Sequence, residues 1–552
     1  MDSSSGAAGR SSLVYLLPLI AKPWLDSSSA AASPSWIPLA LALLCVFAAS
    51  AILFWCFPGG PAWGRSLIFS KKMKNAAAIP GPRGFPVLGS LLDMGALAHR
   101  RLAALARSHS AERLMAVSVG STRMVVSSLP DVARQILASP CFADRPLKQS
   151  AQELLFGRAM GFAPYGDYWR RLRRIASGCL FSPRRIAAQE PLRQAETAAM
   201  VADISGSAAR SNGGGIAVRG FVQRASLNSV MRSVFGRRIG DGEEEVQAMV
   251  REGFELLGAF NWSDHLPFLR QWDPQGVVKR CQQLVPRVNA FVRKIIQERR
   301  AEMAAAEEEN SSSSKAAGGG EDFVHVLLSL QGEDKLEESD MIAVLWEMIF
   351  RGTDTTAILT EWALAELVLN PDVQHKLQSE IDSVCPAGQP VRDSDTERMP
   401  YLQAVINETL RLHPPGPLLS WARLATHDVE ISGYHVPAGT SAMVNMWAIT
   451  HDPSIWPNPE AFDPERFVEN KSFDVRGIDL RLAPFGAGRR VCPGRALGLA
   501  TVKLWIARLV QEFSWMPCED SPVDLSEVLK LSCEMVNPLK ARPVSRRPPA
   551  TH

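Results

Sequence analysis

The chain has 552 residues, of which 46% are hydrophobic and 21% charged, and its formal net charge is +3. These values are typical of a globular protein, and so small an excess of positive charge does not indicate a nucleic-acid-binding protein. The nine cysteines are scattered, odd in number and without a C-x-x-C pair, which argues against a disulfide framework or a zinc site and favours a reducing compartment.

The first predicted element is a membrane anchor at residues 36–57. Its sequence, "WIPLALALLCVFAASAILFWCF", contains no charged residue and as a helix would extend about 33 Å, enough to cross the core of a bilayer. Basic residues follow it and the charges before it cancel, so we expect residues 1–35 on the lumenal side and the body in the cytosol. A cleaved signal peptide is the alternative, but the apolar run continues past the small residues at 48–50.

A basic linker and a proline-rich segment are expected at residues 58–90. The stretch "IPGPRGFPVLGS" at 79–90 contains three prolines and three glycines, which exclude a helix. Because proline stiffens the chain, we interpret this stretch as a rigid hinge that sets the angle of the body to the membrane. An ordinary linker is the alternative. Residues 91–552 are then the cytosolic domain.

The cytosolic domain is predicted to be mainly α-helical with a smaller β-rich part. Residues 114–128 have the pattern of a β-hairpin, and residues 430–447 again have strand and turn character. Low-complexity stretches at 205–215 and 307–320 are expected to be surface loops. The aromatic segment 260–276 is equally compatible with core packing and with contact to the membrane interface.

Residues 345–357, "LWEMIFRGTDTTA", are predicted to form a helix with a local weakness. Gly352 lowers helix propensity, and the hydroxyl of Thr355 can donate to the carbonyl one turn earlier, which opens the helix locally. Such an opening would create a polar groove along an otherwise apolar helix. The alternative is a simple polar interruption in a buried helix.

A charged pair is predicted on the helix that contains "NETLRLHPP". Glu408 and Arg411 are three residues apart, so they lie on one helix face and can form a bidentate ion pair. Arg466 in "FDPERF" follows as a third member. Taken alone, such a pair is more often a solvated pair on a helix surface.

The most specific signal is the segment 484–498, "PFGAGRRVCPGRALG". Gly488 permits a tight turn, and Gly494 permits the close approach of a bulky flat partner. Cys492 precedes a strongly helical sequence, so the helix dipole and Arg490 would stabilise its thiolate, the form that binds a metal. The alternative is a buried free cysteine beside a glycine-rich loop.

This loop resembles the haem-binding loop of the cytochrome P-450 enzymes, the haem-thiolate monooxygenases. The anchor, the helix at 345–357 and the set of Glu408, Arg411 and Arg466 resemble other parts of that family, so the resemblance covers nearly the whole chain. It implies the cytochrome P-450 fold, mainly α with a large helical part and a smaller β-rich part, preceded by one transmembrane helix. It also implies that the three charged residues lock the meander that supports the loop.

The resemblance implies haem b as the cofactor, with the thiolate of Cys492 as the iron ligand. It further implies that Asp354 and Thr355 act as a catalytic pair that relays protons. Arg351 is a departure, since the family usually has Ala or Gly at that position. The residues expected to bind the cofactor are Trp169, Arg173, Arg423, Phe485, Gly488, Arg490, Cys492 and Gly494.

Four of these residues are expected to hold the haem propionates. Trp169 and Arg173 lie in "YWRRLRR" and are four residues apart, on one helix face. Arg423 and Arg490 are the other candidates. Taken alone, a basic helix of this kind is more often a solvated face.

The segments "WEMIFRGTDT" and "RLAPFGAGRRVCPGRALGLATVKLW" closely resemble a plant group of these enzymes, family seventy-eight A. This implies a single-pass protein of the endoplasmic reticulum membrane, a role in organ or seed growth, and fatty acids as the suggested substrate class. Because no flavin or nicotinamide fingerprint is visible, the electrons would come from an NADPH-dependent cytochrome reductase on the same membrane. We expect a basic face to attract that reductase. Propionate binding or plain solvation explains the same residues equally well. The members of this face are Arg489, Arg490, Arg495 and Lys503.

The predicted function is the hydroxylation of a small lipophilic substrate by dioxygen at an unactivated C–H bond. One alternative is an isomerase or dehydratase on the same scaffold, which needs no external electrons. Another is a non-catalytic haem-binding membrane protein. The pair of Asp354 and Thr355 argues against both, since neither alternative needs a proton relay.

Overall fold

The computed structural model describes residues 36–69, 77–211, 214–238, 243–310, 322–386, 388–419, 422–470 and 472–546. The segment expected on the lumenal side, 1–35, lies outside these ranges. The chain divides into two compact units, Met1–Ile52 and Leu53–His552. Helix α2 (Trp36–Trp55) has a mean hydropathy of 2.6 over its most apolar window, and it is long and apolar enough to cross a membrane.

The second unit is mainly helical, as predicted, with short strands between the helices. Its helices are α3 (Pro61–Phe69), α4 (Ala98–Ser108), α5 (Pro130–Ala138), α6 (Gln149–Glu153), α7 (Asp167–Cys179), α8 (Pro183–Ala188), α9 (Glu190–Arg210), α10 (Arg219–Phe235), α11 (Glu243–Gly258), α12 (Trp262–His265), α13 (Val277–Asn310), α14 (Phe323–Ser329), α15 (Glu338–Leu369), α16 (Pro371–Val384), α17 (Asp393–Thr396), α18 (Pro400–Leu412), α19 (Met446–Thr450), α20 (Glu465–Glu469) and α21 (Arg495–Glu512). Its strands are β1 (Met115–Val119), β2 (Thr122–Ser127), β3 (Ile216–Ala217), β4 (Arg423–Leu424), β5 (Val429–Ile431), β6 (Tyr434–Val436), β7 (Ser441–Val444), β8 (Phe513–Pro517), β9 (Glu527–Leu529), β10 (Cys533–Met535) and β11 (Lys540–Ser545).

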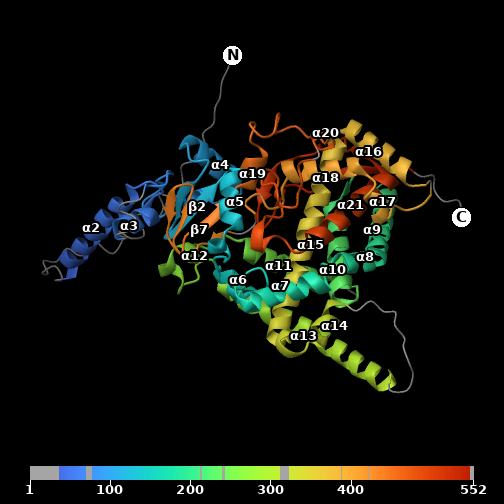
Figure 1. Cartoon of the computed structure of the whole chain (residues 1–552), viewed down its shortest axis with the longest axis horizontal. Helices are drawn as coiled ribbons and strands as arrows, with labels where there is room; N and C mark the ends of the chain where they lie inside the picture. The colour runs from blue at the N-terminus through green and yellow to red at the C-terminus, as the bar shows by residue number, and fades with distance from the viewer. Residues whose placement is uncertain are drawn as a thin grey trace, which may run out of the picture. The chain divides into compact units, whose positions relative to one another are not determined.

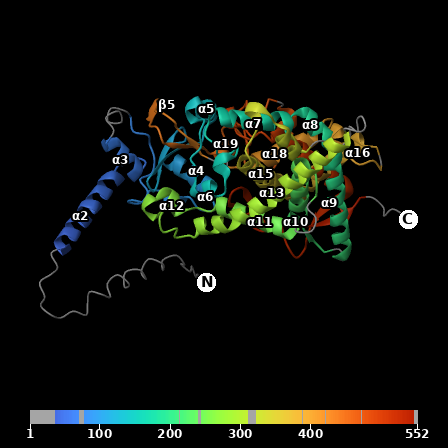
Figure 2. The same cartoon turned by 90° about the horizontal axis from the view of Figure 1, so that it is seen from below.

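Helix α15 runs through the middle of the helical part (Figure 1). Its residues are buried over 340–350 and 357–368, because these stretches are apolar on nearly every face. Helices α10, α18 and α21 pack against it in Figure 1, and α11 and α13 pack against it in the second view (Figure 2). The polar residues between the two apolar stretches therefore lie inside the protein, where they can line a cavity.

The largest sheet has four strands in the order β1-β2-β7-β4. Strands β1 and β2 are antiparallel and pair Val119 with Thr122, which confirms the predicted hairpin. Strand β2 is parallel to β7, and β7 pairs with β4, where Arg423 lies opposite Ala442. This sheet therefore fixes the backbone of one of the arginines predicted to bind the cofactor.

The proline-rich segment 79–90 contains no α-helix, as predicted, and it is held against β1. The N–H of Ala116 donates to the carbonyl of Pro80 over 2.8 Å. A Cβ at Gly81 would lie 2.0 Å from the carbonyl oxygen of Ala116, so the strand can approach this closely only because the residue is glycine.

The two low-complexity stretches were expected to be loops, and that prediction is wrong for part of each. Helix α9 continues through residues 205–210, and α13 continues to Asn310. Both stretches contain alanine, arginine or glutamate at these positions, and these residues favour a helix that has already begun.

Candidate active site

The loop around Cys492 is shaped by its backbone. The N–H of Cys492 donates to the carbonyl of Phe485 over 3.0 Å, which closes the loop. Gly488 has φ of +68°, and a Cβ there would lie 2.0 Å from the carbonyl oxygen of Leu137, so no other residue fits without distortion. Gly494 forms the N-cap of α21, so Cys492 lies just before a helix N-terminus, as predicted.

Cys492 opens into an interior cavity of ≈ 320 Å³. Gly488 is the one predicted cofactor-binding residue outside its lining. It lies within the loop and packs against Leu137. The lining includes nearly all the predicted cofactor-binding and catalytic residues, namely Trp169, Arg173, Asp354, Thr355, Arg423, Phe485, Arg490, Cys492 and Gly494.

The side chain of Cys492 is accessible from the cavity, whereas the protein around the cavity makes this a poor place for a charge. Burial raises the pKa of Cys492, whereas the N–H of Gly494 and the positive charges of Arg351 and Arg173 oppose this rise. The helix N-terminus alone therefore does not make this cysteine a thiolate. A bound metal ion would, because its charge removes the proton of a coordinating thiol.

Arginines gather along the cavity wall and repel one another. Burial, followed by the charges of Arg490 and Arg173, lowers the pKa of Arg423 to about 9. Burial also lowers the pKa of Arg490 to about 10. So many cations around one cavity indicate that it takes an anionic group.

Arg145 is a member of this group that the sequence did not reveal. It lines the cavity, and burial and the charges of Arg423, Arg351 and Arg490 hold its pKa well below the usual value for arginine. Its Nε and Nη1 atoms are buried and have no hydrogen-bond partner within the described residues. A buried guanidinium in this state fits an anion that is not part of the chain, such as a haem propionate.

Two of the arginines join the cysteine loop to the rest of the cavity wall. Arg490 donates from Nε to the carbonyl of Ala143 over 2.8 Å and from Nη2 to the carbonyl of Ala163 over 2.6 Å. Arg173 donates from Nη1 to the carbonyl of Val491 over 2.9 Å. These bonds hold the loop against the segment between α5 and α7.

The indole of Trp169 lies between helix α7 and the arginines. Its Nε1–H donates to the carbonyl of Met160 over 2.9 Å, and the guanidinium of Arg490 lies 4.4 Å from the centre of its ring. Trp169 and Arg173 therefore do share one helix face, and that face is turned to the cavity and not to solvent.

The predicted basic docking face is wrong for one of its members. Arg490 is buried and points into the protein. Lys503 is 12% exposed and pairs with Glu397 over 3.0 Å. Arg489 is exposed, and Arg495 is partly exposed and donates to the carbonyl of Arg476.

The structure brings Glu408, Arg411 and Arg466 together. Arg411 donates from Nε and Nη2 to the two carboxylate oxygens of Glu408, each over 2.7 Å, and both side chains are fully buried. Arg466 donates from Nε to the same carboxylate over 3.1 Å. The remaining donors of Arg411 bind the carbonyls of Thr450, Pro459 and Ala461, so this cluster ties α18 to the chain that leads towards the cysteine loop.

Asp354 and Thr355 both line the cavity from α15. Burial raises the pKa of Asp354 to about 6, against an opposing hydrogen bond from Ser532. A carboxyl group with this pKa can exchange protons near neutral pH. Thr355 is open to the cavity.

The predicted opening of the helix at Gly352 is not present. Helix α15 is continuous from Glu338 to Leu369, and the hydroxyl that donates to a carbonyl one turn earlier belongs to Thr353, over 2.7 Å. Gly352 instead permits close packing, because a Cβ there would lie 2.6 Å from the side chain of Val230 on α10. Helix α10 also supplies Ser226, whose hydroxyl donates to the carbonyl of Gly352 over 3.2 Å.

Arg351 points into the cavity from the same helix and pairs with Glu347. Its Nε donates to Oε1 of Glu347 over 3.0 Å, and that oxygen also accepts the N–H of Gly161 over 2.8 Å. Glu347 is 1% exposed, whereas the side chain of Arg351 is 36% exposed. The residue that departs from the family pattern is thus a cation on the cavity wall.

A second cluster of metal-binding residue types lies outside this cavity. Atoms of His99, Glu527 and Cys533 lie within 4.8 Å of one another. Burial alone would raise the pKa of Glu527, but His99 and Arg100 lower it to about 2. Burial also keeps the Cys533 thiol protonated by raising its pKa. These contacts account for the cluster as a buried ion pair.

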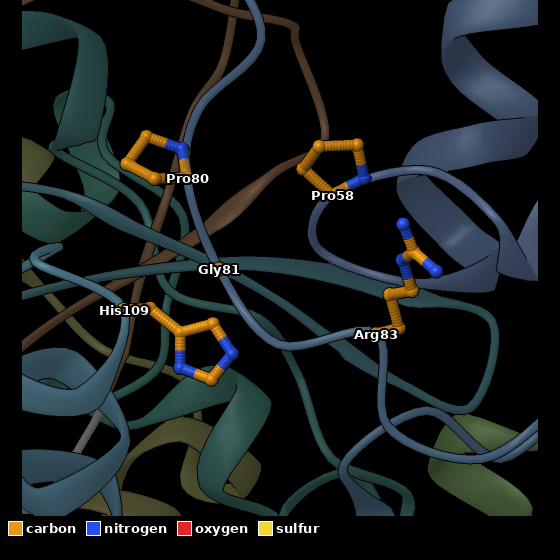
Figure 3. A pocket seen from close by; sticks show the side chains of 5 residues that line it. All are labelled: Pro58, Pro80, Gly81, Arg83 and His109. Atoms are coloured by element: carbon orange, nitrogen blue, oxygen red, sulfur yellow. The ribbon is translucent and has the colours of Figure 1, made fainter.

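A surface hollow of ≈ 500 Å³ lies where the proline-rich segment begins (Figure 3). The hollow is formed by Pro58, Pro80, Gly81, Arg83 and His109. It is wide open to solvent and contains none of the predicted site residues, so the cavity beside Cys492 is the candidate active site.

Comparison with known proteins finds relatives over nearly the whole chain. The family model described as Cytochrome P450 matches residues 79–539. Cytochrome P450 78A11 of Oryza sativa subsp. japonica is 55% identical, over 97% of this chain and 96% of that protein. Cytochrome P450 78A7 of Arabidopsis thaliana is 56% identical, over 88% and 89%. Flavonoid 3'-monooxygenase CYP75B3 of Oryza sativa subsp. japonica is 36% identical, over 94% and 99%.

Proposed function

Because this chain belongs to the cytochrome P450 family, whose members are monooxygenases with a cysteine-ligated haem iron, we propose that it hydroxylates a small lipophilic substrate in the cavity beside Cys492. The observation that carries this proposal is a single cavity that joins a cysteine, a cluster of buried arginines and a carboxyl group of raised pKa. Fatty acids are the substrate class we propose, from the resemblance to family seventy-eight A.

The residues around the cavity fit a haem. Cys492 would ligate the iron, and Arg145, Arg173, Arg423 and Arg490 would hold the propionates together with Trp169. The unpartnered buried nitrogens of Arg145 support this, since a propionate would satisfy them. When bound, the haem iron activates dioxygen for insertion into a C–H bond, and electron donation by the thiolate favours cleavage of the O–O bond.

The chain itself would supply protons and a dry environment. With a pKa of about 6, the carboxyl group of Asp354 can take up and release a proton close to neutral pH, and the hydroxyl of Thr355 on the next residue can pass it into the cavity. Apolar side chains from α10 and α15 enclose the same space and exclude bulk water, among them Val234, Leu359 and Phe350.

We also propose the cellular setting that the resemblance implies. Helix α2 would anchor the chain in the endoplasmic reticulum membrane, with the catalytic domain in the cytosol. An NADPH-dependent cytochrome reductase on that membrane would supply electrons. The reductase, and not this chain, would then bind the flavins and NADPH. A role in plant organ or seed growth rests on the same resemblance.

The proposal is tested by reconstituting the full chain with a plant NADPH–cytochrome reductase in membranes. Medium- and long-chain fatty acids are offered, and products are scored by mass. Hydroxylated product that requires both NADPH and reductase is the expected result. Conversion without NADPH would favour the isomerase or dehydratase alternative. Reductase-dependent iron reduction without product from any acid would remove the fatty-acid assignment.

A further inference from the structure

The cavity carries more positive charge than the haem alone would balance. Arg193 pairs with Asp393 and is set aside. The other lining arginines are Arg145, Arg173, Arg351, Arg423 and Arg490, and the acidic side chains that line the same space are Glu347 and Asp354. The two propionates of a haem would neutralise two arginines, Glu347 pairs with Arg351, and Asp144 lies 3.7 Å from Arg490. One positive charge remains in excess in a space built for a lipophilic substrate, and such an excess disfavours a neutral occupant.

Arg351 is the cation closest in the chain to the proposed proton relay. It precedes Thr355 by four residues on the continuous helix α15, so the two side chains lie on one face about 6 Å apart along the axis. Arg351, Thr355 and Cys492 all line the same cavity. The guanidinium is therefore close to the position where the reaction would occur.

We propose that Arg351 binds the carboxylate of an anionic lipophilic substrate in this cavity. The inference rests on the proposed function and adds to it a residue that selects the substrate by charge. Its guanidinium can donate a charged hydrogen bond to a carboxylate from the edge that faces the cavity, while Nε keeps its bond to Glu347.

Glu347 positions this arginine. Its carboxylate is buried and accepts hydrogen bonds from the N–H of Gly161 and from Nε of Arg351, so it joins α15 to the segment before α7. A Cβ at Gly161 would lie 2.2 Å from Oε1 of Glu347 and 2.4 Å from Nη2 of Arg351, so glycine at this position lets the pair lie directly against the backbone. The guanidinium also lies 5.9 Å from the ring centre of Phe162. The group is thus held in place before a substrate enters, which reduces the entropy lost on binding.

The competing interpretation is that the pair only fastens Gly161 to α15. Both interpretations require the bond between Glu347 and Arg351, so folding and total activity do not separate them. They differ in ligand selectivity. A fastening role affects acids and uncharged esters equally, whereas a binding role affects acids alone.

The experiment is an optical titration of the haem-loaded full chain with dodecanoic acid and with methyl dodecanoate. The shift of the haem absorption on binding gives a Kd for each compound without any turnover. The wild type should bind the acid more tightly than the ester. Arg351→Met should weaken binding of the acid by roughly 10- to 100-fold and leave the ester nearly unchanged, since a charged hydrogen bond of this kind is worth that much. Arg351→Lys, which keeps the charge but loses the bond from Nε to Glu347 that holds the group, should lie between them.

A matched control is Arg300→Ala, which removes an exposed arginine that pairs with Glu338 of the same helix over 3.0 Å. It should leave both Kd values unchanged. If Arg351→Met fails to retain haem, Glu347→Gln combined with Arg351→Met removes both charges and avoids an unpaired buried carboxylate, and its ratio of acid to ester affinity is the deciding value.

The inference is overturned if the wild type binds the ester as tightly as the acid across medium and long chain lengths. An equal loss of affinity for acid and ester in the Arg351 variants would also overturn it, in favour of the fastening role. Failure of the proposed function is distinct from this, because it appears as absent NADPH-dependent product while selective binding of the acid persists.

Discussion

Two glutamate–arginine pairs on neighbouring helices have almost the same sequence spacing and very different surroundings. We call Glu408, Arg411, Arg466 and the loop 484–498 the support side. There, every N–H of the Arg411 guanidinium donates to a protein acceptor, and both partners of the pair are fully buried. In the cavity side, which comprises residues 347–355 of α15, Glu347 is buried but the guanidinium of Arg351 borders the cavity. A closed pair specifies structure, whereas an open pair offers charge to a ligand.

This difference explains why one pair matched a known motif and the other was a departure from it. The support side combines an ion pair within one helix with hydrogen bonds to main-chain atoms, and neither of these contacts a substrate. The cavity side is built from side chains that can change with the substrate while the helix remains.

The largest expected effect in the support side follows from Arg411→Ala. The substitution leaves the buried carboxylate of Glu408 without its main partner and three backbone carbonyls without a donor. We expect the free energy of unfolding to fall by about 3–5 kcal/mol, with loss of bound haem. Urea unfolding and haem content of the purified chain measure both.

The matched control for this change is the exposed pair of Arg300 and Glu338. Arg300→Ala should cost less than about 1 kcal/mol, because solvent screens that pair. Equal losses in the two variants would mean that burial of the Arg411 pair contributes nothing to its role.

A smaller effect is expected in the same region from Gly488→Ala. Alanine would have to adopt φ of +68° and place its Cβ 2.0 Å from the carbonyl oxygen of Leu137. We expect a loss of about 1–3 kcal/mol in the free energy of unfolding and weaker retention of haem. Gly220→Ala is the control, since Gly220 lies in α10 with open space around it, and it should be neutral or slightly stabilising. A neutral Gly488→Ala would contradict the steric argument.

The last stability effect is expected at the cavity wall, from Asp354→Asn, and it differs from the others because it depends on pH. The folded carboxyl group has a pKa of about 6, above its unfolded value of 3.8, so the unfolded chain ionises first as the pH rises. The wild type therefore loses up to about 3 kcal/mol of stability, relative to the variant, between pH 4 and pH 6. Urea midpoints of both proteins across this range measure the difference, and a difference that does not change with pH would show that Asp354 is not perturbed.

Much of the support side could be predicted from the sequence. The turn at Gly488, the helix after Cys492 and the pair of Glu408 with Arg411 depend on spacing within a few residues, and spacing is visible in one chain. The cavity wall could not be predicted in the same way. Arg145 lies in an unremarkable loop, and only the fold brings it close to Arg423, which is distant in the sequence.

The segment 260–276 is a second region whose surroundings could not be predicted from the sequence. Its sequence was equally compatible with the core and with a membrane surface, and the structure divides it. Asn261 and Ser263 are buried, whereas Phe268 is 65% and Trp272 is 75% exposed. Aromatic residues at irregular spacing carry no periodic signal, so the sequence could not assign the two halves to different environments.

The central claim is that Cys492 is the thiolate ligand of a haem iron, and the most direct test is the spectrum of the reduced protein with carbon monoxide. We compare the wild type with Cys492→Ser and with Cys179→Ser, which changes a partly buried cysteine outside the cavity lining. The account predicts a thiolate-type spectrum in the wild type and in Cys179→Ser, and its loss in Cys492→Ser. A Cys492→Ser protein that kept this spectrum would contradict the account, because the iron would then be held by another residue.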